Sequence, residues 1–232
     1  MTNILKNIKN VEQKIVHIAQ RAGRNAADIQ LLAVSKTKPV SQIKEAYQSG
    51  LRHFGENYVQ ESIEKIQQIK LDSEFNEPVF WYFIGPLQSN KTRPVAENFD
   101  WVQSVERLKI AQRLNDQRPS HLSKLNICLQ VNISGEKSKS GTTLADVIEL
   151  ALQVNHLPRL QLRGIMAIPE NTDDQQRLES QFNELHSIYL QLQQLYPQVD
   201  TLSMGMSKDL QTAITCGSNM VRIGTDIFGS RN

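Results

Sequence analysis

Short apolar runs alternate with longer amphipathic segments along the whole chain. In the opening segment, apolar residues recur at steps of three and four, which places them on one face of a helix. These positions are Ile4, Ile8, Val11, Ile15 and Ile18. The run at 31–34 is too short and too uniformly apolar to be half exposed, so it predicts a strand buried on both faces.

Short apolar runs like the one at 31–34 predict eight strands in all. They lie at 31–34, 52–54, 79–84, 101–104, 125–131, 160–166, 199–202 and 220–223. Amphipathic segments predict helices between most of them, at 39–49, 57–69, 90–97, 144–155 and 207–216, with two more beginning at Glu106 and near Thr172. Regular alternation of strands and helices predicts a parallel sheet, and eight such units can close into a (β/α)₈ TIM-type barrel of the α/β class. An open, doubly wound sheet is the alternative.

No stretch rich in proline, glycine or serine divides the 232 residues, so we expect residues 1–232 to form a single domain. Two details of the helix near 172 are also predicted. Thr172 is expected to be its N-cap, because two aspartates follow it and suit the first turn. Leu192 and Leu195 are expected to lie in the core.

Composition narrows the class of protein. Lysine and arginine number 26 and aspartate and glutamate 24, so the chain lacks the charge excess of a nucleic-acid binder. Cys128 and Cys216 are far apart, and the histidines show no metal-ligand spacing, which favours reduced thiols over a disulfide or a zinc site. No apolar stretch approaches the length of a membrane span or of a leader. We therefore expect a cytoplasmic protein without a metal.

Candidate chemistry centres on Lys36, which stands at the end of the first predicted strand. Two turns, 203–207 and 222–225, follow the seventh and eighth strands, where barrels often bind phosphate. Glycine lets the backbone approach an anion, and serine or threonine hydroxyls donate to it. A lysine amine can condense with an aldehyde. Together these features are what a covalently held, phosphorylated aldehyde cofactor needs.

Less specific interpretations stay open for these residues. Lys36 taken alone is also typical of a solvated lysine at a strand end, and Arg222 of an ion pair at the barrel mouth. Lys38 lies two residues on and would face the same side if the strand persists, where its charge would lower the pKa of Lys36. Lys137 and Lys139 lie in a loop that reads as solvated, with a secondary site for anions or cofactor as the alternative.

Six segments carry a family resemblance. They are AVSKT at 33–37, FGEN at 54–57, FIGPLQSNK at 83–91, LRGIM at 162–166, LSMGMS at 202–207 and VRIGT at 221–225. In this order they resemble the pyridoxal phosphate homeostasis protein family, which has the fold of the alanine racemase N-terminal domain. The resemblance spans nearly the whole chain and implies a modified (β/α)₈ barrel with an extra N-terminal helix.

The resemblance implies that pyridoxal 5′-phosphate is the cofactor and that Lys36 binds it as an aldimine, a Schiff base. By the same resemblance, the phosphate site maps onto Ser203, Gly224 and Thr225.

Further residues around the ring follow from the same resemblance. Arg222 would face the pyridine nitrogen, Asn57 would lie near the ring, and Met166 and Met206 would line the pocket. Tyr82 departs from the family pattern, because many relatives carry histidine there, although tyrosine keeps a hydrogen-bond donor.

The function implied is that of a non-catalytic protein that binds pyridoxal phosphate in intracellular vitamin B6 homeostasis and supply, with pyridoxal phosphate-dependent apo-enzymes as candidate recipients. Arg222 favours this role, because a permanently charged arginine cannot take up the proton that a strong electron sink requires on the ring nitrogen. The alternative is an amino-acid racemase-like enzyme, whose second base comes from a C-terminal domain. Since the chain ends at Asn232, directly after the eighth strand, we expect no such domain, and a monomer. A third interpretation is a barrel enzyme that uses Lys36 on sugar phosphates.

Overall fold

The strands close into a barrel. The computed structural model describes residues 3–136 and 140–230, and eight parallel strands pair there in chain order, with β8 returning to β1. The strands are β1 (Gln30–Val34), β2 (His53–Glu56), β3 (Phe80–Phe83), β4 (Trp101–Val105), β5 (Leu125–Val131), β6 (Leu160–Ala167), β7 (Thr201–Ser203) and β8 (Met220–Ile223). The predicted (β/α)₈ barrel is confirmed, and the open, doubly wound sheet is wrong.

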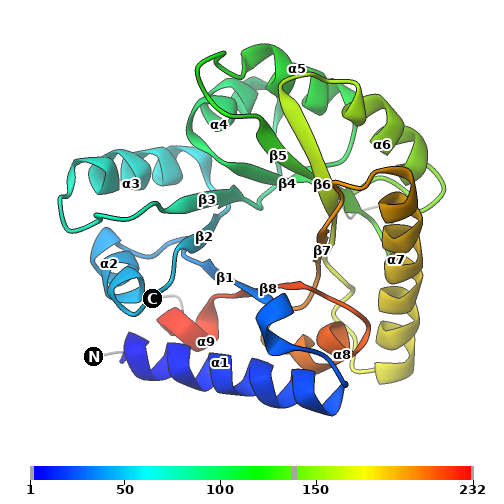
Figure 1. Ribbon diagram of the computed structural model, residues 1–232, viewed down its shortest axis with the longest axis horizontal. Coiled ribbons are helices and arrows are strands. Elements are labelled where there is room, and N and C mark those ends of the chain that lie inside the picture. Colours follow the sequence, from blue (N-terminus) through cyan, green and yellow to red (C-terminus); the bar gives the residue numbers. More distant parts are fainter. Residues whose placement is uncertain (1–2, 137–139, 231–232) are drawn as a thin grey trace.

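Helices surround this ring of strands (Figure 1). They are α1 (Ile4–Arg21), α2 (Val40–Gln48), α3 (Val59–Leu71), α4 (Thr92–Asn98), α5 (Leu108–Gln117), α6 (Val147–Asn155), α7 (Gln175–Leu195), α8 (Leu210–Thr215) and α9 (Thr225–Phe228). Helix α1 precedes the first strand and lies beside α8 and α9, so the expected extra N-terminal helix is present. Its apolar stripe is buried, as the periodicity predicted.

The pleat of each strand decides which side chains face the barrel interior. Residues pointing inward form a small cluster of their own, separate from the apolar layer between strands and helices. Its buried members are Leu32, Tyr82, Ile84, Trp101, Cys128, Met166 and Met220. Along β1, Leu32 and Val34 belong to this interior set, whereas Ala33 packs outward. Strand β1 ends at Val34, and Lys36, two residues further on, lies at the mouth of the barrel.

Several boundaries differ from those predicted. Strand β7 extends to Ser203, one residue further than expected. The N-cap of α7 is Asp174, whose side chain accepts a hydrogen bond from the Arg177 N–H, whereas Thr172 caps the Asp174 N–H just upstream. Leu192 is buried, but Leu195 is 55% exposed at the end of α7, so its expected place in the core is wrong.

Within residues 3–136 and 140–230, no helix is long and apolar enough to cross a membrane, and no group of histidine, cysteine, aspartate or glutamate side chains could hold a metal ion. Cys128 and Cys216 are both buried as free thiols. Lys137 and Lys139, for which a solvated loop was predicted with a secondary anion or cofactor site as the alternative, lie outside the described residues.

Candidate functional site

A cavity of about 480 Å³ opens at the carboxyl ends of the strands, the end where TIM barrels carry their active sites. Loops after β1, β2, β6, β7 and β8 surround it. Six of the predicted site residues line it, namely Lys36, Asn57, Met206, Arg222, Gly224 and Thr225. The barrel thus brings together residues as distant in the sequence as Lys36 and Thr225.

Lys36 reaches the cavity from a turn. Strand β1 ends at Val34, and Lys36 and Thr37 form a turn that the Lys38 N–H closes on the Ser35 carbonyl at 3.1 Å. The Lys38 ammonium donates to the Ser230 carbonyl at 2.8 Å. The extended geometry that would set Lys38 beside Lys36 is therefore wrong, because the strand stops two residues before the lysine.

Arg222 joins three strands beneath the cavity. Its Nη1 donates to both the carbonyl and the hydroxyl of Ser203, each at 2.8 Å, and its Nη2 donates to the Ala167 carbonyl at 2.8 Å. The residue is 4% exposed, and this burial lowers its pKa to about 10, an effect that the nearby Asp209 carboxylate opposes. The guanidinium therefore stays charged at neutral pH and lines the cavity floor.

Ser203 does not line the cavity. As the last residue of β7 it points into the barrel, where its hydroxyl donates to Gln103 Oε1 at 2.8 Å and accepts from Arg222. Ser207, four residues further, lines the cavity instead. The difference follows from the extra strand residue, which turns the Ser203 side chain inward rather than into the loop.

The turn after β7 is held by Asp209, a residue that the sequence interpretation missed. Its Oδ1 accepts the Met206 N–H at 2.6 Å, and the side chain is 8% exposed while lining the cavity. Burial raises its pKa. Its Oδ2 is buried with no hydrogen-bond partner among residues 3–136 and 140–230. The sequence signal was an aspartate directly before α8, where side chains often fold back on a turn.

Asn57 contributes a polar atom that is ready for a ligand. Its Oδ1 is buried, with no hydrogen-bond partner in the part of the chain that the structure describes. Gly85 from the next loop packs against the backbone of Asn57, and a Cβ at position 85 would lie 2.3 Å from the Asn57 carbonyl oxygen. Buried polar atoms of this kind need a partner, so a bound molecule that supplies a donor fits here.

Gly224 and Thr225 begin α9 on the opposite side of the cavity. The ends of β8 and β1 approach closely here, since a Cβ on Gly224 would lie 3.1 Å from the Val34 carbonyl oxygen. The first N–H groups of a helix have no partner within the helix. The Thr225 hydroxyl and these N–H groups therefore present donors to an anion.

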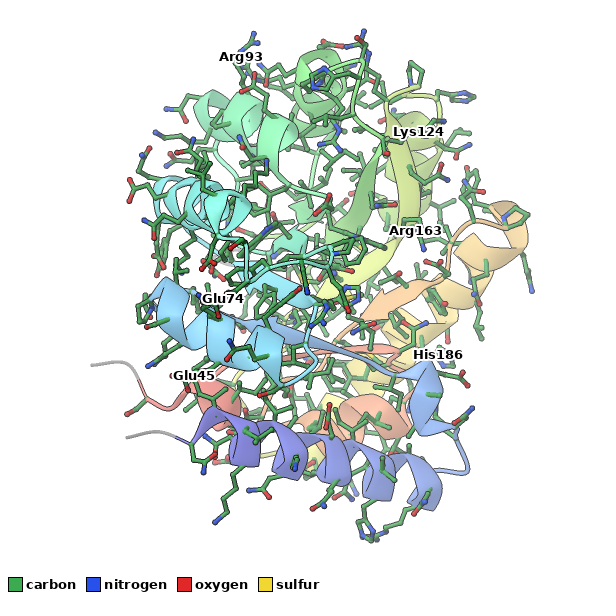
Figure 2. The ribbon with its side chains drawn as sticks, turned by 60° about the vertical axis from the view of Figure 1, so that its left-hand side comes forward. Glu45, Glu74, Arg93, Lys124, Arg163 and His186 are labelled. Carbon is green, nitrogen blue, oxygen red and sulfur yellow. The ribbon has the colours of Figure 1, made fainter. Side chains whose placement is uncertain are left out.

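Tyr82 and Met166 lie deeper than predicted. Both are buried in the interior cluster and neither lines the cavity. The Tyr82 hydroxyl is 2.9 Å from His53 Nδ1, and its ring stacks on Trp101 with centroids 5.1 Å apart. The guanidinium of Arg163, which Figure 2 labels, lies over the same Trp101 ring, 4.8 Å from its centroid. These side chains close the barrel below the site.

The His53 environment predicts a pH effect on stability. Burial lowers the pKa of His53, so the unfolded chain binds a proton more readily than the folded one. The contribution of neutral His53 to stability is therefore fully present above about pH 6.5, the pKa of an unfolded histidine. It is lost as the pH falls from there toward the lower pKa of the folded state. In urea unfolding between pH 5 and 7.5, His53→Gln should show a shallower loss than the wild type. If the free energy of unfolding fell equally steeply with pH in both proteins, other groups would cause the effect. His186 is one such group, because burial also lowers its pKa.

Sequence interpretation also missed the loop after β6. Ile168, Glu170 and Thr172 line the cavity, and Glu170 forms an ion pair with Arg177 at 2.5 Å. The signal was general, because every loop at the carboxyl end of a barrel borders the site.

The cavity as a whole offers a primary amine, hydroxyl and N–H donors and a buried guanidinium. This set of groups suits a small molecule that carries a carbonyl and an anionic group.

Comparisons with known proteins agree with this geometry. Residues 7–232 match the family model of the alanine racemase N-terminal domain. A protein of Pasteurella multocida named pyridoxal phosphate homeostasis protein is 54% identical over 231 residues, covering 99% of this chain and 98% of the relative.

Solved structures are similar as well. The PipY protein of Synechococcus elongatus, solved with PLP bound, is 33% identical with a TM-score of 0.83, covering 98% of this chain and 100% of that one. A protein of Bifidobacterium adolescentis is 31% identical with a TM-score of 0.92, covering 97% of this chain and 94% of that one.

Proposed function

This chain belongs to the pyridoxal phosphate homeostasis protein family, and we propose that it holds pyridoxal 5′-phosphate (PLP) as a Schiff base on Lys36, in the service of intracellular vitamin B6 homeostasis and supply. The observation that carries the proposal is a single cavity lined by Lys36, by Arg222 and by the two turns after β7 and β8. PLP carries an aldehyde, a pyridine ring and a phosphate, and each finds a matching group there.

The residues that would hold PLP follow from the chemistry of the donors. The Lys36 amine would bond to the aldehyde. The Thr225 and Ser207 hydroxyls, with the N–H groups at the start of α9, would bind the phosphate. Arg222 would face the ring nitrogen, and the unpartnered Asn57 Oδ1 would accept a hydrogen bond. When bound, PLP supplies a reactive aldehyde on a ring that can withdraw electrons.

We propose that the protein stores and supplies PLP and does not react it further. Arg222 supports this, since its guanidinium stays charged and already donates to three acceptors, so it does not take up a proton. Relatives are named for homeostasis. Pyridoxal phosphate-dependent apo-enzymes are the recipients we propose, whereas the monomeric state and the cytoplasmic location stay predictions.

A visible spectrum tests the proposed function. The purified wild type, incubated with PLP and passed over a desalting column, should be yellow, lose the colour with borohydride and carry the reduced label on Lys36 by peptide mass spectrometry. A protein that stays colourless and unlabelled would contradict it. Trapping of a sugar phosphate on Lys36, or amino-acid racemisation at enzyme-like rates, would favour one of the two catalytic alternatives.

The assignment of the phosphate site gives a further prediction. Ser207→Ala combined with Thr225→Val removes two hydroxyls, each worth about 1 kcal/mol as a hydrogen bond, so PLP should dissociate about tenfold to thirtyfold faster. Ser203→Ala is the comparison, because Ser203 bonds to Gln103 and Arg222 inside the barrel. Dissociation is followed by transfer of PLP to an excess of a scavenging amine. If PLP dissociated faster from Ser203→Ala than from the double variant, the phosphate would be assigned to Ser203 and not to Ser207 and Thr225.

A further inference from the structure

We propose that Glu56, Glu61 and Lys65 are positioning residues, which clamp the backbone on both sides of Lys36 and so set its amine for capture of PLP. The clamp lies behind the strand ends, on the side of β1 and β2 that faces α3, and none of its three members lines the cavity. This inference rests on the proposed function, because it assigns Lys36 the covalent bond to PLP.

Lys65 is the centre of the clamp. The residue lies on α3 and is 6% exposed. Its ammonium donates to the Ser35 carbonyl and to Glu56 Oε1, each at 2.9 Å, and it forms an ion pair with Glu61 Oε1 at 2.5 Å. Three oxygens therefore surround an ammonium that has three N–H groups. The Lys65 amine is thereby kept from reacting with an aldehyde, and the residue before Lys36 is held by its carbonyl.

The two carboxylates extend the clamp to both neighbours of Lys36. Glu56 lies at the end of β2, is fully buried, and accepts a hydrogen bond from the Ser35 hydroxyl at 2.7 Å. Glu61 accepts the Thr37 N–H at 2.6 Å. Both acceptor oxygens also bind the Lys65 ammonium. One connected set of charged hydrogen bonds therefore fixes Ser35 and Thr37, and Lys36 lies between them.

The backbone at this turn needs such support. Thr37 has a φ of 62°, and no other residue apart from glycine has a positive φ in the described ranges 3–136 and 140–230. The left-handed conformation is disfavoured for a β-branched residue and persists where surrounding contacts determine it. The Glu61 carboxylate, which accepts the Thr37 N–H, ties this residue to α3. The strain thus sits next to the residue whose amine must be placed accurately.

Glu61 offers the sharpest test, because it is partly exposed and its removal spares the core. Glu61→Ala deletes the acceptor for the Thr37 N–H, whereas Glu61→Gln keeps a carbonyl in reach of it. Glu64→Ala is the matched control on the same helix, where the exposed carboxylate accepts a hydrogen bond from the Gln60 side chain one turn away. All three are made in the full chain and mixed with PLP.

Two readouts separate positioning from a general structural role. Borohydride trapping over time gives the rate of labelling at Lys36, which should fall about tenfold or more in Glu61→Ala, since small misplacements of a reacting group cost rates of this order. It should recover largely in Glu61→Gln and be unchanged in Glu64→Ala. Hydrogen exchange of the Thr37 amide in protein free of PLP should speed up in Glu61→Ala alone, with a melting temperature close to that of the wild type.

The outcomes distinguish this proposal from the proposed function. If the wild type takes no label at Lys36, the proposed function fails. If the wild type is labelled and Glu61→Ala is labelled at the same rate, the clamp does not position Lys36, and the inference is overturned. Equal losses in Glu61→Ala and Glu64→Ala would also overturn it, because they would point to a general effect on α3.

Discussion

Lys36→Ala is expected to leave no covalently bound PLP after borohydride reduction, whereas the wild type should be labelled at this residue. Lys36 lies in the turn just after β1 and lines the cavity. A Schiff base needs a primary amine, and alanine supplies none at this position. The yellow absorbance band and the mass increase on the peptide containing residue 36 are the two measurements.

Two other lysines serve as controls for this prediction. Lys38→Ala removes an amine that donates to the Ser230 carbonyl, outside the cavity lining, and should keep both the colour and the label on Lys36. Lys208→Ala removes the exposed lysine that does line the cavity, and should likewise keep the label. A label that survives in Lys36→Ala at the wild-type level, on either of these lysines, would contradict the assignment of the covalent bond.

The barrel itself could be predicted from the sequence because the patterns that encode it are local. The steps of three and four in α1 and the uniformly apolar run of β1 each reflect one burial environment. Their order then restricts the topology to few choices. Predicted and observed strands agree to within one or two residues at most ends, for example at 125–131, which matches β5 in full.

Within the site, the same locality explains which of the predicted residues line the cavity. Lys36, Asn57 and Arg222 line the cavity as expected, because each lies at or just beyond a strand end. Ser203, which the resemblance assigns to the phosphate site, points into the barrel, whereas Ser207 of the same turn lines the cavity. At the end of a strand, a single residue decides which way a side chain points.

Contacts between distant segments account for what the sequence could not predict. Tyr82 lies against His53 and Trp101 below the cavity, a placement that depends on the register of three strands. The hold of Lys65 on the residue before Lys36 likewise joins two elements that are 30 residues apart. No periodicity within one segment encodes such pairs.

Arg222→Met is expected to destabilise the protein free of PLP by about 3–5 kcal/mol, the range measured when one partner of a buried charged network is removed. Methionine is apolar, so the substitution leaves the carbonyls of Ser203 and Ala167 and the Ser203 hydroxyl without their donor. It also removes the cation next to the buried Asp209 carboxylate. Urea unfolding at pH 7, where the Arg222 guanidinium is charged, measures the loss.

A surface arginine provides the control for the stability loss expected in Arg222→Met. Arg93 on α4, labelled in Figure 2, pairs with Glu97 at 3.7 Å, and both side chains are exposed. Arg93→Met should therefore change stability by less than about 1 kcal/mol. Arg222→Lys keeps the charge but cannot span all three acceptors, and should fall between the two. PLP should dissociate faster from both Arg222 variants and at the wild-type rate from Arg93→Met. If Arg222→Met were as stable as Arg93→Met, the guanidinium would not be what joins β6, β7 and β8 beneath the cavity.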